Sequence, residues 1–240
     1  MTMKGDRDKR GVGKSGGDFW QTGLLDNIKD ARSALEYFRN YKGIKADKVF
    51  LLGHSEGAII STRLAGNGAD VAGVILLAGA AQKGEDILKW QAQQIARSLK
   101  GFNGWLIKLL HIDVAKAQQK QIDKIKRSSK DWYRIQLFNK INAKWMREFL
   151  AYNPADDLPK VKVPILAITG SKDIQVNPED LTRMAGLVNT DFEYHLLPDV
   201  THILRTEKGP PSIATYRQQV IRPMDSRILT IVLDWLNKRV

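Results

Sequence analysis

A serine stands between two glycines in the segment Gly53-His54-Ser55-Glu56-Gly57, which joins two apolar segments. The preceding apolar run, 49–52, predicts a strand buried on both faces, as in a parallel sheet. Residues 58–65 predict a helix that stops near Gly66. A Gly-x-Ser-x-Gly motif also fits a plain tight turn, but between strand and helix it indicates a nucleophile elbow, which exposes the serine hydroxyl at the carboxyl end of the sheet. We expect Gly53 and Gly57 to let strand and helix approach closely.

The rest of the chain alternates strands and helices. Apolar runs predict further strands, and helical spacing of apolar residues predicts a helix before the elbow and another at the end of the chain. This alternation predicts an α/β fold with a mainly parallel sheet and helices on both faces. The predicted strands are 71–80, 163–170 and 192–198, and the predicted helices are 24–41 and 227–236.

Residues 82–150 interrupt this alternation. The segment holds 15 Lys and Arg against 6 Asp and Glu, and its apolar residues, such as Trp90, Ile95, Trp105 and Trp145, fall at helical spacings. It predicts several amphipathic helices inserted between two strands. We therefore divide the chain into a core, 1–81 and 151–240, and a helical cap insertion, 82–150, over the carboxyl edge of the sheet. Ordinary core helices with no lid role are the alternative.

Composition and charge exclude several classes of protein. The net charge of +12 gathers in the cap, where it indicates either a solvated helical face or attraction to an anionic surface. No nucleic-acid-binding motif accompanies it, so no nucleic acid partner is expected. With no cysteine and four histidines, no metal site is expected. No apolar stretch reaches the roughly 20 residues of a membrane span, and the first residues lack the apolar core of a signal peptide, so a cytoplasmic location is the default expectation.

Two residues after later strands complete a candidate site. Ser55 needs a base to take its proton, and that base needs an acid to orient it. Asp173 follows strand 163–170, and His202 follows strand 192–198, in the chain order that a nucleophile elbow requires. We predict that Ser55 attacks an acyl carbon, that His202 acts as general base and then acid, and that Asp173 orients the imidazole. The backbone N–H of Glu56 is the predicted oxyanion donor, and His54 is expected to line the pocket.

Other residues compete for these roles. Asp173 alone would also fit a turn, and Asp199 is a weaker acid candidate that fits a turn better. His195 lies within a strand, so its side chain is committed to a sheet face. His111 lies in the cap, where a surface or packing role is expected. Asp180 stands at a helix start, where a carboxylate has a dipole and capping role.

A second motif, Gly11-Val12-Gly13-Lys14-Ser15, resembles the end of a phosphate-binding P-loop. The full pattern needs a glycine where Asp8 stands, an apolar strand before it and a helix after it. Charged residues precede the motif and two glycines follow it, so we do not expect a phosphate site.

With these motifs, the chain resembles bacterial α/β-hydrolases of the serine esterase and serine aminopeptidase-like group. The resemblance extends over residues 8–15, the elbow, residues 163–176 and the His202 loop. It implies the α/β-hydrolase fold, an acyl ester, thioester or amide substrate and no cofactor. It also implies that Asp8 and Arg10 are structural. A carboxylesterase that acts on small acyl esters is the expectation, and an aminopeptidase or thioesterase is the nearest variant.

The resemblance also implies four strands before residue 8. This sequence does not supply the first three, and residues 1–7 are too polar for a buried fourth strand. The fold is therefore expected to be N-terminally incomplete, with strand 49–52 as an exposed apolar edge. The second oxyanion donor, which the resemblance puts after the third of these strands, would be absent, at a cost of roughly 100- to 1000-fold in turnover. The chain is then a piece of a longer one, a shortened natural protein, or one half of a homodimer whose partner covers the edge. A non-catalytic protein that binds a partner or an anionic surface through its basic cap is the second hypothesis.

Overall fold

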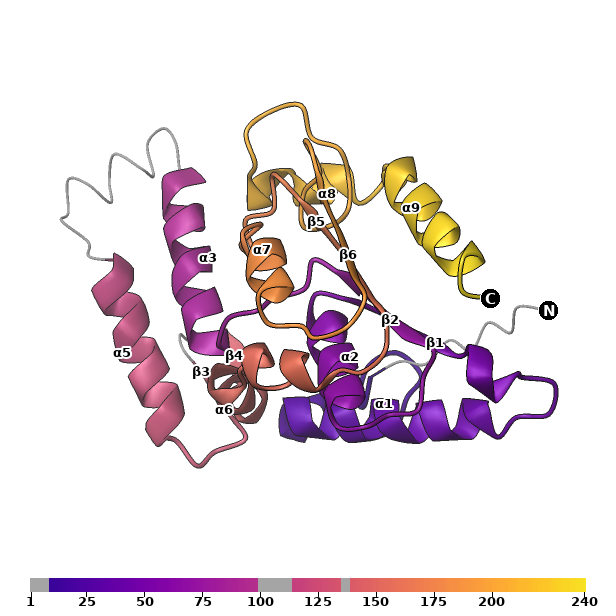
Figure 1. Cartoon of the computed structure of the whole chain (residues 1–240). Helices are drawn as coiled ribbons and strands as arrows, with labels where there is room; N and C mark the ends of the chain where they lie inside the picture. Colours follow the sequence, from indigo (N-terminus) through magenta and orange to yellow (C-terminus); the bar gives the residue numbers. More distant parts are fainter. Residues whose placement is uncertain (1–8, 99–113, 135–138) are drawn as a thin grey trace.

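A four-stranded parallel sheet forms the centre of the molecule (Figure 1). The computed structural model describes residues 9–98, 114–134 and 139–240. Each strand pairs in parallel with its neighbour, so the carboxyl ends of all four strands meet at one edge of the sheet. The strands, in spatial order, are β1 (Phe50–His54), β2 (Gly73–Leu77), β5 (Ile165–Gly170) and β6 (Phe192–Leu197).

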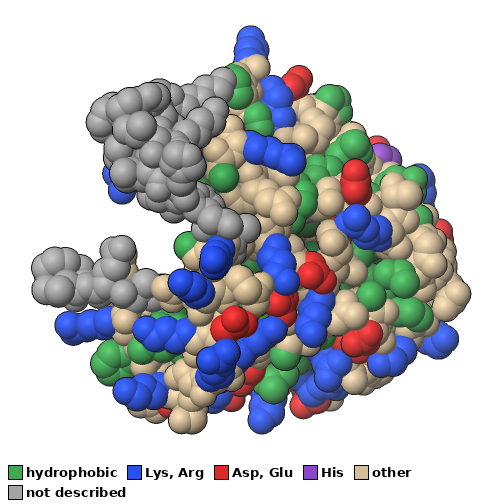
Figure 2. All heavy atoms as spheres, turned by 90° about the vertical axis from the view of Figure 1, so that its left-hand side faces the viewer, with side chains coloured by type: hydrophobic (Ala, Val, Ile, Leu, Met, Phe, Trp, Pro, Cys, Tyr) green, Lys and Arg blue, Asp and Glu red, His purple; other side chains and the backbone are tan. Residues whose placement is uncertain are grey.

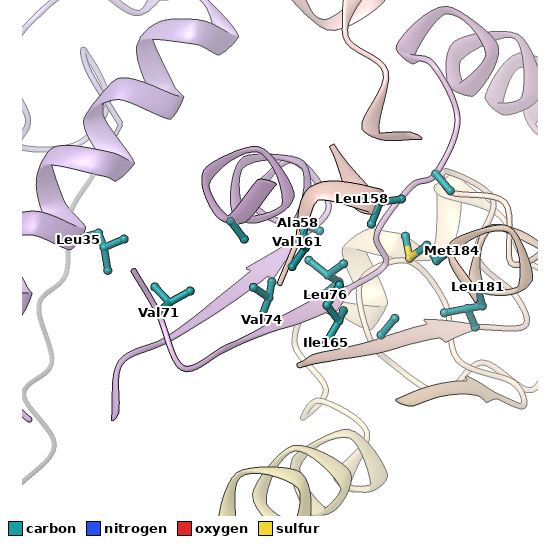
Figure 3. Packing of buried hydrophobic residues seen from close by; sticks show 13 residues of the cluster. Leu35, Ala58, Val71, Val74, Leu76, Leu158, Val161, Ile165, Leu181 and Met184 are labelled. Carbon is teal, nitrogen blue, oxygen red and sulfur yellow. The ribbon is translucent and has the colours of Figure 1, made fainter. Parts of the chain in front are cut away.

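Helices cover both faces of this sheet. On one face, alternate residues of β2 and β5 pack against α1 (Leu24–Arg39), α2 (Glu56–Gly66) and α7 (Asp180–Ala185), and Figure 3 shows this cluster. On the other face, the remaining residues of β2 and β5 pack against α9 (Ser226–Asn237). The continuous apolar runs of the inner strands are thus explained by burial on both sides. The predicted fold class is confirmed.

Most of the predicted elements of the core are present with small shifts of their ends. The predicted strand 71–80 is shorter, because only Gly73–Leu77 pairs with its neighbours, and the helix after the elbow begins at Glu56 rather than Ala58. A short helix, α8 (Tyr216–Gln219), precedes α9. The 3-10 turns are η1 (Phe19–Gln21), η2 (Ala46–Lys48), η3 (Pro154–Asp156), η4 (Leu158–Lys160) and η5 (Ile213–Thr215).

The interval between β2 and β5 contains both helices and strands. A helical segment was expected here, but the short antiparallel pair β3–β4 stands between two of its helices. Trp105 and His111 lie outside the described residues. The described elements of this interval are α3 (Gly84–Ser98), α5 (Val114–Arg127), β3 (Trp132–Arg134), β4 (Lys140–Asn142) and α6 (Ala143–Ala151).

This inserted segment packs against loops at the carboxyl edge of the sheet. Ile87 of α3 and Phe149 of α6 share an apolar cluster with Ala80, which follows β2, and Val176, which follows β5. The side chain of Gln91 donates a hydrogen bond of 2.7 Å to the backbone carbonyl of Gln175. The division of the chain into core and cap stays a prediction, but the contacts put α3 and α6 beside the edge where the candidate site lies.

Helix α5 carries much of the positive charge of the insertion. Ile122 and Ile125 are buried against α6, whereas Lys120, Lys124 and Arg127 are exposed. Figure 2 shows Lys and Arg side chains gathered on this side of the molecule. Of the two interpretations of this charge, the arrangement fits a solvated helical face better than attraction to an anionic surface. Within the described residues, no helix is long and apolar enough to cross a membrane.

Strand β1 lies at an edge of the sheet. In the described residues it pairs with β2 alone, and the side chain of Leu52 is 55% exposed. An apolar edge strand of this kind is a site for pairing with another chain. The homodimer that would cover it stays a prediction.

Candidate active site

Ser55 lies on the sharp turn between β1 and α2, with φ 55° and ψ −113°. A non-glycine residue with positive φ is strained by about 1–3 kcal/mol, and such strain is found at sites that hold a side chain in a fixed position. Gly53 is required here, because a Cβ at this position would lie 2.1 Å from the carbonyl oxygen of Gly57. The expectation of close approach fails at Gly57 itself, where a Cβ would meet no atom within 4 Å.

The structure brings Ser55, His202 and Asp173 together at the carboxyl edge of the sheet. His202 Nε2 lies 3.0 Å from Ser55 Oγ, and His202 Nδ1 lies 2.9 Å from Asp173 Oδ2. A carboxylate can only accept a hydrogen bond, so Nδ1 carries the proton and Nε2 is left to accept the proton of the hydroxyl. The side chains of His202 and Asp173 are 5% and 0% exposed. Their assignment as a catalytic triad stays a prediction, which these distances support.

Both oxygens of the Asp173 carboxylate are hydrogen bonded. While Oδ2 faces His202, Oδ1 accepts the backbone N–H groups of Gln175 and Val176, each at 2.8 Å. These two donors fix the orientation of the carboxylate and satisfy a charge that burial would otherwise make costly. The backbone of the loop after β5 therefore binds and orients the Asp173 side chain.

Backbone contacts tie the Asp173 loop to the His202 loop. The N–H of Lys172 donates to the carbonyl of Val200 at 2.9 Å. At Gly170, the last residue of β5, a Cβ would lie 2.1 Å from that same carbonyl oxygen, so only glycine allows the approach. Sequence reasoning missed Gly170, because a glycine at the end of a strand gives no sign of which loop it will meet.

His54 makes a contact that its position in the motif did not reveal. Its Nε2 lies 2.7 Å from the backbone carbonyl of His202, and since a carbonyl only accepts, Nε2 donates this bond. The two imidazole rings lie 5.0 Å apart between centroids. Burial lowers the pKa of His54, so the neutral ring is favoured. His54 therefore joins the elbow directly to the loop that carries His202.

The first residues of α2 present backbone donors beside the serine. The N–H of Ser55 itself is used, because it donates to the carbonyl of Leu77 at 2.9 Å. The N–H groups of Glu56 and Gly57 are in the first turn of α2, where a helix offers no intrahelical acceptor. The position of the Glu56 N–H therefore suits the predicted role of oxyanion donor.

The competing candidates lie elsewhere. Asp199 forms an ion pair of 2.7 Å with Lys172 and has φ 64°, as a turn residue does. His195 bonds to Glu193 within β6 at 2.9 Å. Asp8 lies outside the described residues, and Arg10 forms a bidentate pair with Asp30 at 2.6 and 2.7 Å.

The segment that resembles a P-loop folds into turns. The N–H of Gly11 donates to the carbonyl of Gly16 at 3.0 Å, and Gly11 has φ 67°. A 3-10 turn follows, and α1 begins only at Leu24. The strand–loop–helix context of a phosphate-binding loop is thus not found in the described part of this segment.

Asp180 stands at the start of α7, as expected, but it does not cap the helix. The N-cap of α7 is Glu179, and Asp180 instead accepts the N–H of Ala81 at 3.0 Å and the side-chain amide of Gln82 at 2.9 Å. Burial raises its pKa. Asp180 thus fixes the chain that leaves β2 at the start of the insertion. Within the described residues, no group of three or more His, Asp or Glu side chains is arranged to hold a metal ion.

Comparison with known proteins gives the family. The family described as serine aminopeptidase, S33, matches residues 7–209. The chain belongs to this family. The resemblance that the motifs indicated is therefore confirmed.

The most similar proteins include an esterase and other α/β-hydrolases. Esterase EstD of Thermotoga maritima is 24% identical over 215 residues, which are 88% of this chain and 47% of that protein. The chain thus spans about half the length of this curated relative. The α/β-hydrolase GrgF of Penicillium sp. sh18 superimposes with a TM-score of 0.58 at 15% identity, over 97% of this chain and 78% of that one. A monoacylglycerol lipase of Paleococcus ferrophilus has a TM-score of 0.54 at 18% identity, over 97% and 82% of the two chains. At these identities the structures establish the α/β-hydrolase fold.

Proposed function

We propose that this protein is a carboxylesterase-type serine hydrolase that cleaves carboxylic esters through an acyl-enzyme intermediate on Ser55. The observation that supports it most is the unbroken line of hydrogen bonds from Ser55 Oγ through His202 to Asp173. Membership of a serine hydrolase family and similarity to a named esterase support the same reaction class.

The geometry suggests how the reaction proceeds. Ser55 Oγ attacks the carbonyl carbon of the ester while its proton passes to His202 Nε2, and the buried Asp173 carboxylate stabilises the resulting imidazolium. The backbone N–H of Glu56 donates to the negative charge that develops on the carbonyl oxygen. The bond to the alcohol then breaks, and the alcohol leaves with the proton from Nε2. Water attacks the acyl-enzyme with His202 again as base, which releases the acid and restores Ser55.

The inserted segment would border the site at the carboxyl edge of the sheet. Because α3 and α6 pack on the loops after β2 and β5, we assign residues 82–150 as a cap that borders the substrate pocket. Trp145 and Phe149 of α6 stack with ring centroids 5.0 Å apart, which gives this border a rigid aromatic surface.

Hydrolysis of p-nitrophenyl butyrate tests the proposal. The protein should release p-nitrophenol, and Ser55→Ala should lower kcat by about 10⁴-fold or more, because the nucleophile is lost. Ser226→Ala, at the exposed start of α9, is the matched control and should behave as the wild type. Equal rates for Ser55→Ala and the wild type would reject the nucleophile.

The same protein can be tested on other acyl groups. The family description favours amide substrates as the second candidate, and a panel of aminoacyl p-nitroanilides and acyl thioesters beside the esters would separate these activities. If no substrate is cleaved, and the protein binds anionic liposomes in a salt-sensitive manner, the result favours the non-catalytic hypothesis over the hydrolase.

A further inference from the structure

A pocket of about 410 Å³ lies beside the nucleophile turn, between the loop before α1 and the start of α6. Its walls include Phe19 and Trp20 of η1 on one side and Trp145 and Met146 of α6 on the other. Glu56, the residue after Ser55, forms another part of the lining. The pocket therefore extends from the immediate neighbour of the nucleophile into the inserted segment, and its volume falls in the range of small-molecule sites, roughly 300–1,000 Å³.

Hydrogen bonds across the pocket hold its two sides together. The side-chain amide of Asn142, the N-cap of α6, donates to the backbone carbonyls of Phe19 at 2.6 Å and Thr22 at 2.7 Å. Glu148 of α6 accepts the backbone N–H of Leu25 at 2.7 Å. The walls thus form a preformed cavity, which needs little rearrangement to receive a ligand.

The charges that line the pocket are balanced with one exception. Lys9 is paired with Glu56 at 2.6 Å, and Arg10 is paired with Asp30. Lys140 has no carboxylate partner among the described residues. Its ammonium nitrogen instead lies 4.3 Å from the ring centroid of Trp20 and 3.7 Å from that of Trp132.

Aromatic faces stabilise a cation but do not neutralise it. The Trp20 and Trp132 rings also take the place of water around the ammonium group, so its attraction to an anion is screened less than that of an exposed lysine. The pocket consequently combines mostly apolar, aromatic walls with a single positive charge that has no acidic partner in the described part of the chain.

We propose that this pocket binds the part of the substrate remote from the scissile ester bond, and that this part is apolar or aromatic and ends in a carboxylate. The carboxylate would pair with Lys140, and the ester carbonyl would lie at Ser55, next to Glu56. The proposal rests on the proposed function, because it names the class of ester that the Ser55 site would accept.

Two matched pairs of esters test this specificity. The first pair, the p-nitrophenyl monoester of glutarate and p-nitrophenyl pentanoate, differs in charge on the acyl side. The second pair, para-carboxyphenyl butyrate and phenyl butyrate, differs in charge on the alcohol side. We expect kcat/KM to be about tenfold higher for the charged member of one pair, as for a hydrogen bond to a charged group, and the pair that responds identifies which side enters the pocket.

Variants of Lys140 decide the assignment. Lys140→Met keeps an unbranched apolar side chain, one atom shorter, beside the two indole rings and should remove the preference for the charged ester. Lys140→Arg should keep the preference. Lys162→Met, exposed and near the opposite end of β5, is the control and should keep the wild-type ratio. No preference within either pair, or a preference that survives Lys140→Met, would overturn the proposal.

Binding to a Ser55→Ala protein separates this proposal from the proposed function. Calorimetry should show tighter binding of the charged ester than of its neutral partner, and weaker binding of the charged ester when Lys140→Met is added. That result supports the pocket even if the wild type hydrolyses neither ester. If the charged and the neutral member of each pair are hydrolysed at equal rates and bind equally well, the proposed role of the pocket is rejected. The assignment of Ser55 as nucleophile would then remain intact.

Discussion

The two halves of the candidate site are built in opposite ways. The half with Asp173 and His202 is nearly inaccessible to solvent, and hydrogen bonds to backbone groups of the loops after β5 and β6 fix it. The half with Glu56 and Lys9 has side chains that are 21% and 49% exposed, and ion pairs between side chains join it. The sheet and its loops thus dictate the position of the candidate triad, whereas surface residues and the insertion line the pocket. Changes in the first half should therefore have large effects, and changes in the second half small ones.

The largest effect is expected from Asp173→Asn. An amide keeps the size of the side chain but loses the negative charge that orients and stabilises the imidazolium, so kcat on a p-nitrophenyl ester should fall by about 10⁴-fold. Asp199→Asn, in the neighbouring loop, is the control and should change kcat less than about threefold. An Asp173→Asn protein of nearly normal activity would remove Asp173 from the mechanism.

A substitution at Gly170 tests the contact between the two loops of the buried half. Gly170→Ala forces a Cβ against the Val200 carbonyl and should lower the free energy of unfolding by about 2–3 kcal/mol. Thermal unfolding should then shift by roughly 5–10 °C. Gly186→Ala, where the nearest atom to a Cβ is 3.6 Å away, should unfold within about 2 °C of the wild type. Equal unfolding temperatures for the two variants would contradict the close contact between Gly170 and the Val200 carbonyl.

His54 tests whether the elbow helps to position His202. His54→Ala removes the hydrogen bond to the His202 carbonyl and should lower kcat by about 10- to 100-fold, because a small displacement of the base is costly. His54→Gln can donate to the same carbonyl and should recover part of the loss. Unchanged kcat in His54→Ala would show that the loop is positioned without this bond.

The same histidine predicts a dependence of stability on pH. Burial lowers the pKa of His54 in the folded protein, so the unfolded chain binds more protons below its ordinary pKa of about 6.5. Stability should consequently rise with pH up to about 6.5 and be lost as the pH falls further. In His54→Gln this contribution is absent, and the unfolding temperature should fall less than in the wild type between about pH 7.5 and about pH 5. An equal fall in both proteins would contradict the assignment.

The smallest effect is expected in the exposed half. Lys9→Gln breaks the ion pair with Glu56, but surface pairs of this kind contribute about 0–1 kcal/mol. The unfolding temperature should change by no more than about 4 °C, and by less at high salt, as differential scanning fluorimetry would show. A loss of stability as large as that of Gly170→Ala would contradict the claim that changes in the exposed half have the smaller effects.

Patterns that are local in sequence predicted much of this molecule. The apolar runs predicted β1, β2, β5 and β6, and the elbow motif with strand ends predicted that Ser55, Asp173 and His202 would lie at one edge. These predictions succeed because a parallel sheet aligns the carboxyl ends of its strands, so that the short loops after them start at one edge.

Features that depend on contacts between distant segments were missed. The pair β3–β4 has three residues in each strand, which is too short to give a periodic signal. The bond from His54 to the His202 carbonyl and the close approach at Gly170 join residues far apart in the chain. The aromatic pocket around Lys140 likewise combines residues 19–20 with Trp132 and residues 140–146, which no local pattern connects.

The most direct test is the site of reaction with a fluorophosphonate probe, read by peptide mass spectrometry. A single adduct on Ser55, formed by the wild type and lost when His202 is changed to alanine, is the result expected if His202 activates the Ser55 hydroxyl. An adduct on a different residue, or labelling of Ser55 that proceeds equally well without the imidazole, would contradict it.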